Sequence, residues 1–188
     1  MMKVPVSVLC LSLLAAPVLA EPMTGKAAAK LMYRGEGAVV QMLDGAGLPE
    51  ADVTALTMVG TGQPWYGAIA ISPDEGLMVE ATVAAVNHHT VGAAETAARQ
   101  GCDAKRKGKA ACVVVAHLLP KGWKPADLTL SQDATAALRK EYKAPGALAI
   151  SPSTGSFALT KGEAAGDLAV QTCNEKAGTK DCIVAVQD

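Results

Sequence analysis

The sequence predicts an α+β fold made of two tandem strand-strand-helix-strand repeats, each holding one disulfide. Three observations support this prediction. A ten-residue motif occurs twice, as GAIAISPDEG over residues 67–76 and as GALAISPSTG over residues 146–155. An alanine-rich, helix-like segment follows each motif, and each such segment leads to a pair of cysteines with nearly the same spacing. A shared order of motif, helix and cysteine pair indicates that one structural unit has been duplicated.

Each motif predicts a strand that ends in a tight turn. The apolar runs 68–71 and 147–150 are followed by Ser-Pro-x-x-Gly, and this composition is typical of a strand entering a turn. Proline presets φ near −65°, and Gly76 and Gly155 can adopt the positive φ that a returning strand often needs. We therefore expect a hairpin in each repeat, with second strands over residues 77–83 and 156–160.

A helix and a third strand complete each unit. Thr90 is placed to cap a helix over residues 91–100, and a similar small-residue pattern covers residues 161–171. Apolar strands follow at 112–116 and 182–186. Each unit would have one open sheet edge and one apolar helix face. We therefore expect the two repeats to share one mixed or antiparallel sheet with the helices packed on it.

The cysteine spacing predicts which disulfides form. Nine residues separate Cys102 from Cys112, and eight separate Cys173 from Cys182. Four cysteines allow three connectivities, and the repeated spacing favours pairing within each repeat over pairing between repeats. Neither pair has the Cys-x-x-Cys spacing of a redox-active site, so we expect both bridges to be structural.

The first 20 residues are typical of a secretory signal peptide. Lys3 precedes a short apolar run, and Val-Leu-Ala before Glu21 predicts cleavage after Ala20. Lipidation at Cys10 is the less favoured alternative, because no glycine or alanine follows it. No later stretch reaches the ~20 apolar residues of a transmembrane helix. We therefore expect an exported protein, periplasmic or secreted, without a transmembrane segment.

The net charge and the aromatic content limit the classes of partner that the protein can bind. Loss of residues 1–20, whose only charge is Lys3, changes the formal net charge from −1 to −2. This charge argues against nucleic acid as the main partner. Only 3% of the residues are aromatic, so a core of aliphatic side chains leaves few ring faces for stacking sugars or bases.

The chain then divides into five segments. Residues 1–20 are the signal peptide, and residues 21–65 form an N-terminal extension with short helices near 27–33 and 49–59, which we expect to pack on the first repeat. The first repeat covers residues 66–119. The connector covers residues 120–144 and holds a helix over 131–142. The second repeat covers residues 145–188.

The repeated motif and its cysteines resemble the domain-of-unknown-function 4189 type found in exported bacterial proteins. The matching positions are Gly67 to Gly76 with Cys102 and Cys112, and Gly146 to Gly155 with Cys173 and Cys182. The likeness covers roughly half of the chain after residue 20. The second copy departs from it by having Pro145 where the first has Tyr66. The resemblance implies an exported, disulfide-bonded fold and supplies no activity.

Three groups of side chains are candidates for a binding site. His88 and His89 could bind copper or zinc if His117 folded back beside them, and the alternative is a polar loop with a strand-end histidine. The second candidate is a basic loop that holds Lys105, Arg106, Lys107 and Lys109. It could contact phospholipid headgroups or a cell-wall polymer, and the alternative is a loop that is only solvated.

The third candidate is the aromatic pair Trp65 and Tyr66. It could anchor a protein or peptide partner, but we favour a plug that closes one end of the small-residue core.

The motifs favour a binding function over catalysis. Neither Gly-x-Ser-x-Gly, Ser-x-x-Lys nor a phosphate-binding loop occurs, so no catalytic residues and no cofactor are expected. The leading hypothesis is a non-enzymatic module that binds an envelope protein or a cell-wall component. The alternatives are a small envelope enzyme or enzyme inhibitor with a site between the repeats, and a metal-binding protein that uses the three histidines.

Overall fold

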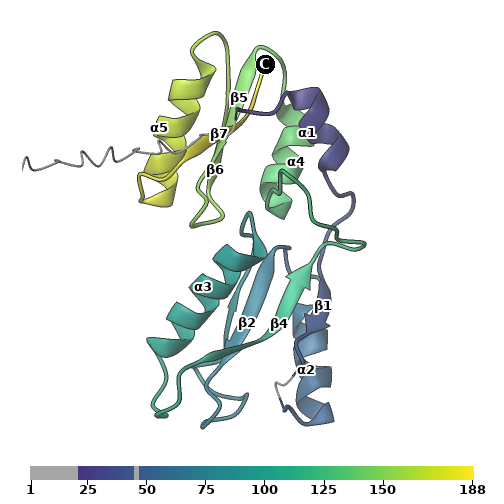
Figure 1. Cartoon of the computed structure of the whole chain (residues 1–188), viewed down its shortest axis with the longest axis vertical. Helices are drawn as coiled ribbons and strands as arrows, with labels where there is room; N and C mark the ends of the chain where they lie inside the picture. The colour runs from purple at the N-terminus through teal and green to yellow at the C-terminus, as the bar shows by residue number, and fades with distance from the viewer. Residues whose placement is uncertain (1–20, 45–46) are drawn as a thin grey trace, which may run out of the picture.

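The computed structural model describes residues 21–44 and 47–188 (Figure 1). The predicted signal peptide and Cys10 therefore lie outside the described residues. The elements, in chain order, are α1 (Gly25–Leu31), β1 (Val39–Met42), α2 (Glu50–Gly60), β2 (Gly67–Ile71), β3 (Val83–Ala85), α3 (Val91–Asp103), β4 (Val113–Leu119), α4 (Gln132–Glu141), β5 (Gly146–Ile150), β6 (Phe157–Lys161), α5 (Ala165–Ala177) and β7 (Ile183–Gln187). The α+β class is confirmed. None of the helices in this part of the chain is long and apolar enough to cross a membrane.

The two repeats build separate antiparallel sheets, so the expectation of one shared sheet is wrong. The first sheet has the order β1-β4-β2-β3 and the second has the order β6-β5-β7. Within each repeat the motif strand, β2 or β5, lies in the middle and pairs with strands of its own repeat on both sides. The outer edge of β4 is taken by β1, and Met23 bridges to Val186 on the outer edge of β7. The N-terminal extension thus lies on one edge of each sheet, and β3 and β6 form the opposite edges.

The two sheets share a detailed irregularity. The pairing of β2 with β4 shifts between Ile69 and Ala70, and the pairing of β5 with β7 shifts between Leu148 and Ala149. These positions are equivalent in the repeated motif. Because a β-bulge is a specific local geometry, its recurrence at one motif position is strong support for duplication.

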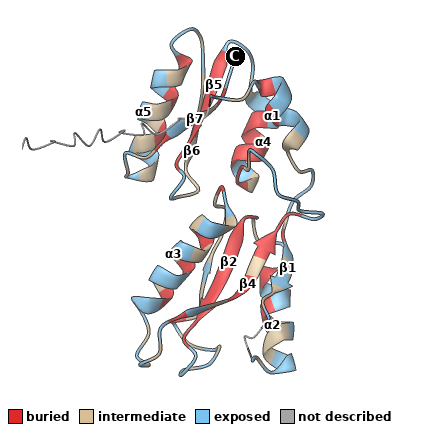
Figure 2. Ribbon diagram, viewed as in Figure 1, coloured by how far each residue is buried: buried red, intermediate tan, exposed pale blue. Residues whose placement is uncertain are grey.

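Small residues hold one helix close to each sheet. Ala68 and Ala70 on β2 pack with Ala94 and Ala98 on α3, and the second repeat has an equivalent alanine cluster between β5 and α5. Figure 2 shows the buried residues along β2, β4 and β5 and on the helix faces turned toward them. Alanine side chains on both surfaces allow a helix to lie close to a sheet. Both predicted disulfides lie in these clusters and are confirmed, Cys102–Cys112 and Cys173–Cys182.

The opposite face of each sheet carries larger side chains and a second helix. Leu56 of α2 packs in one cluster with Ile69 and Leu118, whereas Leu138 of α4 packs in another with Leu148. The connector helix is therefore part of the second repeat's core, as α2 is of the first. The duplicated unit is helix-strand-strand-helix-strand, one helix longer than the sequence predicted.

The N-terminal extension divides between the repeats. As expected, β1 and α2 pack on the first repeat. In contrast, α1 contacts α4 and β7, and Met23 exchanges backbone hydrogen bonds with residues of β7. The expectation that the whole extension packs on the first repeat is thus wrong for Met23 and α1.

Two boundaries differ from the prediction. The second strand of the first repeat begins at Val83, because residues 77–82 form a local loop in which Thr82 donates hydrogen bonds to the carbonyl oxygens of Leu77 and Val79. The second repeat's helix begins at Ala165, because the strand β6 continues to Lys161 and a turn follows. The Thr90 cap of α3 is confirmed, with its side chain accepting from the Ala93 amide.

Candidate functional site

The two repeats meet at His89, which is 1% exposed. Its Nδ1 accepts a hydrogen bond from the backbone amide of Ser131 at 3.1 Å, and its Nε2 lies 3.0 Å from the carbonyl oxygen of Ser156. Because Nδ1 is an acceptor, the neutral ring carries its proton on Nε2 and donates it to Ser156. Burial lowers the pKa of His89, against an opposing effect of the Ser156 hydrogen bond. The neutral ring therefore links the first repeat both to the cap of α4 and to the second hairpin.

A second contact lies beside His89. The Asn87 side-chain amide donates to Asp133 Oδ2 at 2.8 Å, and its Oδ1 accepts from the Asp133 amide at 3.2 Å. Asn87 has a left-handed φ of 62°, a conformation that asparagine tolerates better than most residues. A Cβ on Gly155 would lie 2.0 Å from the Asn87 carbonyl oxygen. Gly155 is thus needed for close approach between the repeats.

This use of Gly155 differs from the prediction. Gly76 has the expected positive φ of 78°, but Gly155 is not among the glycines with positive φ. The same motif position serves turn geometry in the first repeat and contact between repeats in the second.

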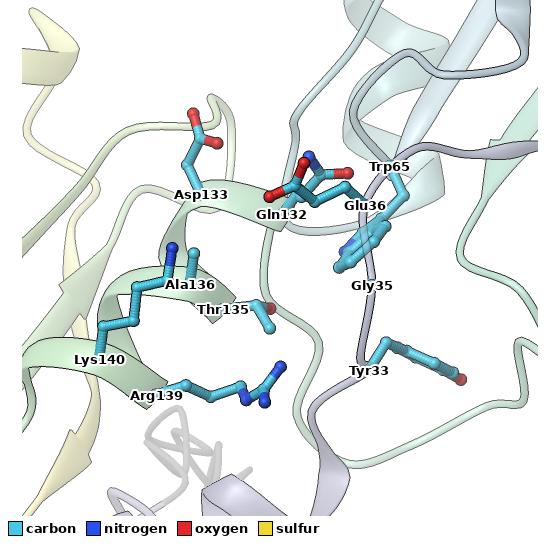
Figure 3. Close-up of a pocket in the computed structure, with 10 residues that line it drawn as sticks. All are labelled: Tyr33, Gly35, Glu36, Trp65, Gln132, Asp133, Thr135, Ala136, Arg139 and Lys140. Atoms are coloured by element: carbon cyan, nitrogen blue, oxygen red, sulfur yellow. The ribbon is translucent and has the colours of Figure 1, made fainter.

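A cavity of about 660 Å³ lies at this junction (Figure 3). One wall is α4, which contributes side chains at i, i+3, i+4 and i+7 from Gln132 to Arg139 and therefore presents one helical face to the cavity. The other wall comes from the segment between α1 and β1, with Tyr33, Gly35 and Glu36, and from Trp65 before β2. The cavity is thus assembled from both repeats and the N-terminal extension.

The floor of the cavity is held by hydrogen bonds. Gln132 Oε1 accepts from the Gly37 amide at 2.9 Å, so the Gln132 amide NH₂ is left as a donor. Thr135 is 4% exposed, and its hydroxyl contacts the Leu130 carbonyl oxygen at 3.3 Å. The Trp65 indole N–H donates to the same carbonyl oxygen, also at 3.3 Å. These contacts fix the positions of the lining side chains before any ligand binds.

Charged groups lie at the two ends of the α4 face. Arg139 and Lys140 are in its last turn, and Figure 3 shows them on the side of the cavity away from Glu36. Asp133 lies in the first turn. Among the described residues, Arg139, Lys140 and Glu36 form no salt bridge within 4.0 Å. The lining thus has two positive and two negative side chains, of which three are free to pair with a ligand.

The aromatic pair singled out from the sequence is buried. Trp65 and Tyr66 are each 2% exposed, and burial raises the pKa of the Tyr66 hydroxyl. The Trp65 ring packs edge-on against Tyr33, with 6.4 Å between ring centroids. Both rings are buried, as a plug requires, but they pack in the cluster of larger side chains and not among the alanines, and Trp65 also borders the junction cavity.

The three histidines occupy different environments. His89 uses both ring nitrogens at the junction, as described above. His117 Nε2 lies 2.6 Å from Glu95 Oε1, and burial lowers the pKa of His88. Over residues 21–44 and 47–188, no cluster of three or more histidine, cysteine or acidic side chains is placed to hold a metal ion.

The basic loop is fixed by acidic side chains from the first turn. Glu75 Oε2 accepts from the amides of Lys107 and Gly108, and Asp74 Oδ2 accepts from those of Lys109 and Ala110, all at 2.8–3.0 Å. Arg106 turns inward to Asp103 Oδ1 at 2.7 Å and to two loop carbonyl oxygens. The side chains of Lys105, Lys107 and Lys109 remain exposed.

Of the residues that border the cavity, only Trp65 is among the candidates predicted from the sequence. A helix over residues 131–142, as predicted from the sequence, places four residues on one face. These are Gln132, Thr135, Ala136 and Arg139, and their spacing is the sequence feature that could have indicated this wall of the cavity. The opposite wall carries no motif, because its residues are distant in sequence and come together only when α1 packs on α4.

Comparisons with family models, with curated protein sequences and with solved structures gave no match to this chain.

Proposed function

We propose that this protein is an exported, non-enzymatic binding protein whose ligand occupies the junction cavity. The observation that carries the proposal is the cavity's construction. A partly open cavity of about 660 Å³ lies between the two repeats, beside charged side chains that have no salt-bridge partner among the described residues. Ligand pockets are usually of this size and occur preferentially where structural units meet.

Export is supported by the sequence and by the bridges. Residues 1–20 have the pattern of a secretory signal, and two buried disulfides are typical of proteins that mature in an oxidising compartment. The resemblance to the domain-of-unknown-function 4189 type remains a prediction and agrees with this location. Mass spectrometry of the mature protein tests export, with an N-terminus at Glu21 as the expected result and an intact Met1 as the contrary one.

Binding is favoured over catalysis by the chemistry of the lining. Thr135 carries the one buried hydroxyl on the α4 face, and this hydroxyl donates to the Leu130 carbonyl oxygen. The ten residues that border the cavity include neither histidine nor cysteine. A nucleophilic mechanism needs a base within hydrogen-bond reach of the nucleophile. The lining therefore suits recognition by charge and hydrogen bonding.

The proposal is tested by nuclear magnetic resonance. Amide spectra of the oxidised protein are recorded with four probes, which are succinate, glycine, trialanine and N-acetylglucosamine. We expect at least one probe to shift the amides of Gly35, Glu36 and Ala136. An Ala136→Trp variant should abolish the shifts by filling the cavity, whereas Leu168→Trp, on the exposed surface of α5, should preserve them. Shifts that survive Ala136→Trp, or none with any probe, would overturn the proposal.

A further inference from the structure

The charges around the junction cavity narrow the class of ligand, an inference that rests on the proposed function. Two basic and two acidic side chains border the cavity, Arg139 and Lys140 against Glu36 and Asp133. The net charge of the lining is therefore zero. A ligand with only anionic groups would meet repulsion from the acidic pair, and a purely cationic ligand would meet repulsion from the basic pair. The arrangement fits a ligand that carries both charges.

The direction in which such a ligand lies is set by α4. Arg139 and Lys140 stand in the last turn of the helix, where positive side chains are stabilised by the helix dipole, and they can pair with a carboxylate. The first-turn amides are not available to a carboxylate, because Asp133 N donates to Asn87 and Ala134 N to Ser131 Oγ. A ligand carboxylate therefore belongs at the end of α4 that carries the basic pair.

The opposite end offers acceptors for an ammonium group. Glu36 is exposed and forms no salt bridge among the described residues, and Asp133 has one oxygen engaged by Asn87. Carboxylate oxygens accept hydrogen bonds from an ammonium group and balance its charge. In Figure 3, Glu36 lies next to Gln132, on the side of the cavity remote from Lys140.

The spacing of the two ends limits the ligand's length. Arg139 lies seven positions after Gln132, and Lys140 lies seven after Asp133, which corresponds to roughly 10 Å along a helix. An extended chain covers roughly 3.3–3.6 Å per residue, so about three residues span this distance. The Ala136 methyl group lies on α4 between the two ends, and its small size suits small ligand side chains.

We infer that the junction cavity binds a zwitterionic peptide of about three small residues. Its terminal carboxylate pairs with Arg139 and Lys140, and its terminal ammonium pairs with Glu36 and Asp133. The Gln132 amide NH₂ is placed to donate to the peptide backbone.

Calorimetric titration with defined peptides tests this inference. The probes are trialanine, N-acetyl-trialanine, trialanine amide and free alanine, each added to the oxidised protein. We expect trialanine to bind most tightly and the loss of either terminal charge to weaken binding about 10- to 100-fold. Free alanine should bind weakly, because it cannot reach both ends. Equal affinity for trialanine and its amide, or equal affinity for trialanine and alanine, would overturn the inference.

An Arg139→Gln variant tests the proposed orientation. It should weaken trialanine binding about 10- to 100-fold but leave the affinity for trialanine amide unchanged, since the amide lacks the charge that Arg139 recognises. Lys143→Gln, which removes an exposed positive charge outside the cavity lining, is the matched control and should change neither affinity. A similar loss for both ligands in Arg139→Gln would contradict the orientation.

The two proposals fail in different ways. If none of the four calorimetric probes binds but succinate or N-acetylglucosamine shifts the cavity amides, the peptide inference is overturned and the proposal of a binding site in the cavity is kept. If no probe of either experiment perturbs the cavity, both are overturned.

Discussion

Both repeats tie their Ser-Pro turn to their disulfide loop, but they do so with the chemical roles reversed. In the first repeat the turn supplies the acceptors, because Asp74 and Glu75 accept from four amides of the loop. In the second repeat the loop supplies the acceptor, because Asp181 accepts from Ser151 Oγ and the Ser153 amide. The contact between turn and loop has been kept while the charge has moved from one side to the other.

The comparison changes how the sequence differences are interpreted. The two copies of the motif differ at the turn, with Asp74-Glu75 in the first and Ser153-Thr154 in the second. The structure gives both a role within the fold. Burial raises the pKa of Asp181, but hydrogen bonds from Ser153, Thr179 and Ser151 outweigh it and hold that pKa well below its usual range. An ionised Asp181 thus stabilises the second loop, as Asp74 and Glu75 stabilise the first.

The open ends of the two sheets are closed differently as well. Trp65 and Tyr66 fill the end of the first repeat. In the second repeat Tyr142 packs in the core, and its hydroxyl lies 2.9 Å from the Gly146 carbonyl oxygen and 3.0 Å from Asp188 Oδ2. Burial, together with Asp188, raises the pKa of Tyr142 to about 12. One repeat uses an aromatic pair and the other a single tyrosine anchored by the chain's last residue.

The largest loss is expected from Trp65→Ala. Removing a buried tryptophan leaves a cavity and costs about 4 kcal/mol in the free energy of unfolding. Trp123, which is 39% exposed, provides the matched control, and Trp123→Ala should cost about 1 kcal/mol or less. Denaturant unfolding measures both. Similar losses for the two variants would contradict the role of Trp65 as a plug.

The fold was predictable to the extent that it is encoded locally. The motif, the Thr90 cap and the cysteine spacing are all short-range patterns, and they gave the strands, a helix start and both disulfides. The pairing of β1 with β4 and of Met23 with β7, in contrast, joins residues that lie far apart in the sequence. No local pattern encodes such pairings.

The candidate site was less predictable for the same reason. Tyr33 and Trp65 are distant in sequence from Arg139, and only the packing of α1 on α4 places them around one cavity. His89 was noticed as a metal ligand, but its role between the repeats depends on Ser131 and Ser156, which no motif connects to it.

Removing one disulfide at a time tests whether the repeats are energetically equivalent. The loops are closed by bridges with sequence separations of 10 and 9 residues, and loop entropy predicts a loss of about 2.6 kcal/mol for each. The variants are Cys102→Ala with Cys112→Ala, and Cys173→Ala with Cys182→Ala. Equal losses in thermal unfolding are expected. A difference well above 1 kcal/mol would show that contacts in the folded loops, rather than chain entropy, dominate.

The equivalent glycines of the two turns should respond differently to alanine. Gly155→Ala brings a Cβ against the Asn87 carbonyl oxygen, so the two repeats must separate slightly, at a cost of about 2 kcal/mol. Gly76→Ala meets no neighbouring atom within 4 Å but keeps a positive φ, which costs about 1 kcal/mol. Amide exchange at Asn87 and Asp133 should accelerate in Gly155→Ala and stay unchanged in Gly76→Ala. Acceleration in both would contradict the assigned contact.

The smallest effect is expected from titration of His89. Its pKa is lowered in the folded state by burial, so the unfolded chain binds the proton more readily and stability falls as the pH decreases below the unfolded pKa of about 6.5. Between about pH 7.5 and 6.0, the free energy of unfolding falls by at most about 0.8 kcal/mol. The pKa of His89 in the unfolded chain sets this limit, however far the pKa in the folded protein is lowered. The pKa of His88 is also lowered by burial, so it adds a loss of the same sign.

A His89→Gln variant isolates the contribution of the junction, because glutamine keeps a donor and an acceptor but does not titrate. Its unfolding free energy should fall less steeply over this pH range than that of the parent, while the His88 contribution remains in both proteins. The carboxylates with lowered pKa values, Asp181, Asp103 and Glu75, lose their stabilising effect only as the pH falls below about 5, so they leave this window unaffected. Identical pH slopes for the parent and the variant would contradict a neutral His89 at the junction, because a doubly protonated ring cannot accept the hydrogen bond from the Ser131 amide. In that case the two repeats would be held together by the Asn87–Asp133 and Gly155 contacts rather than by the histidine.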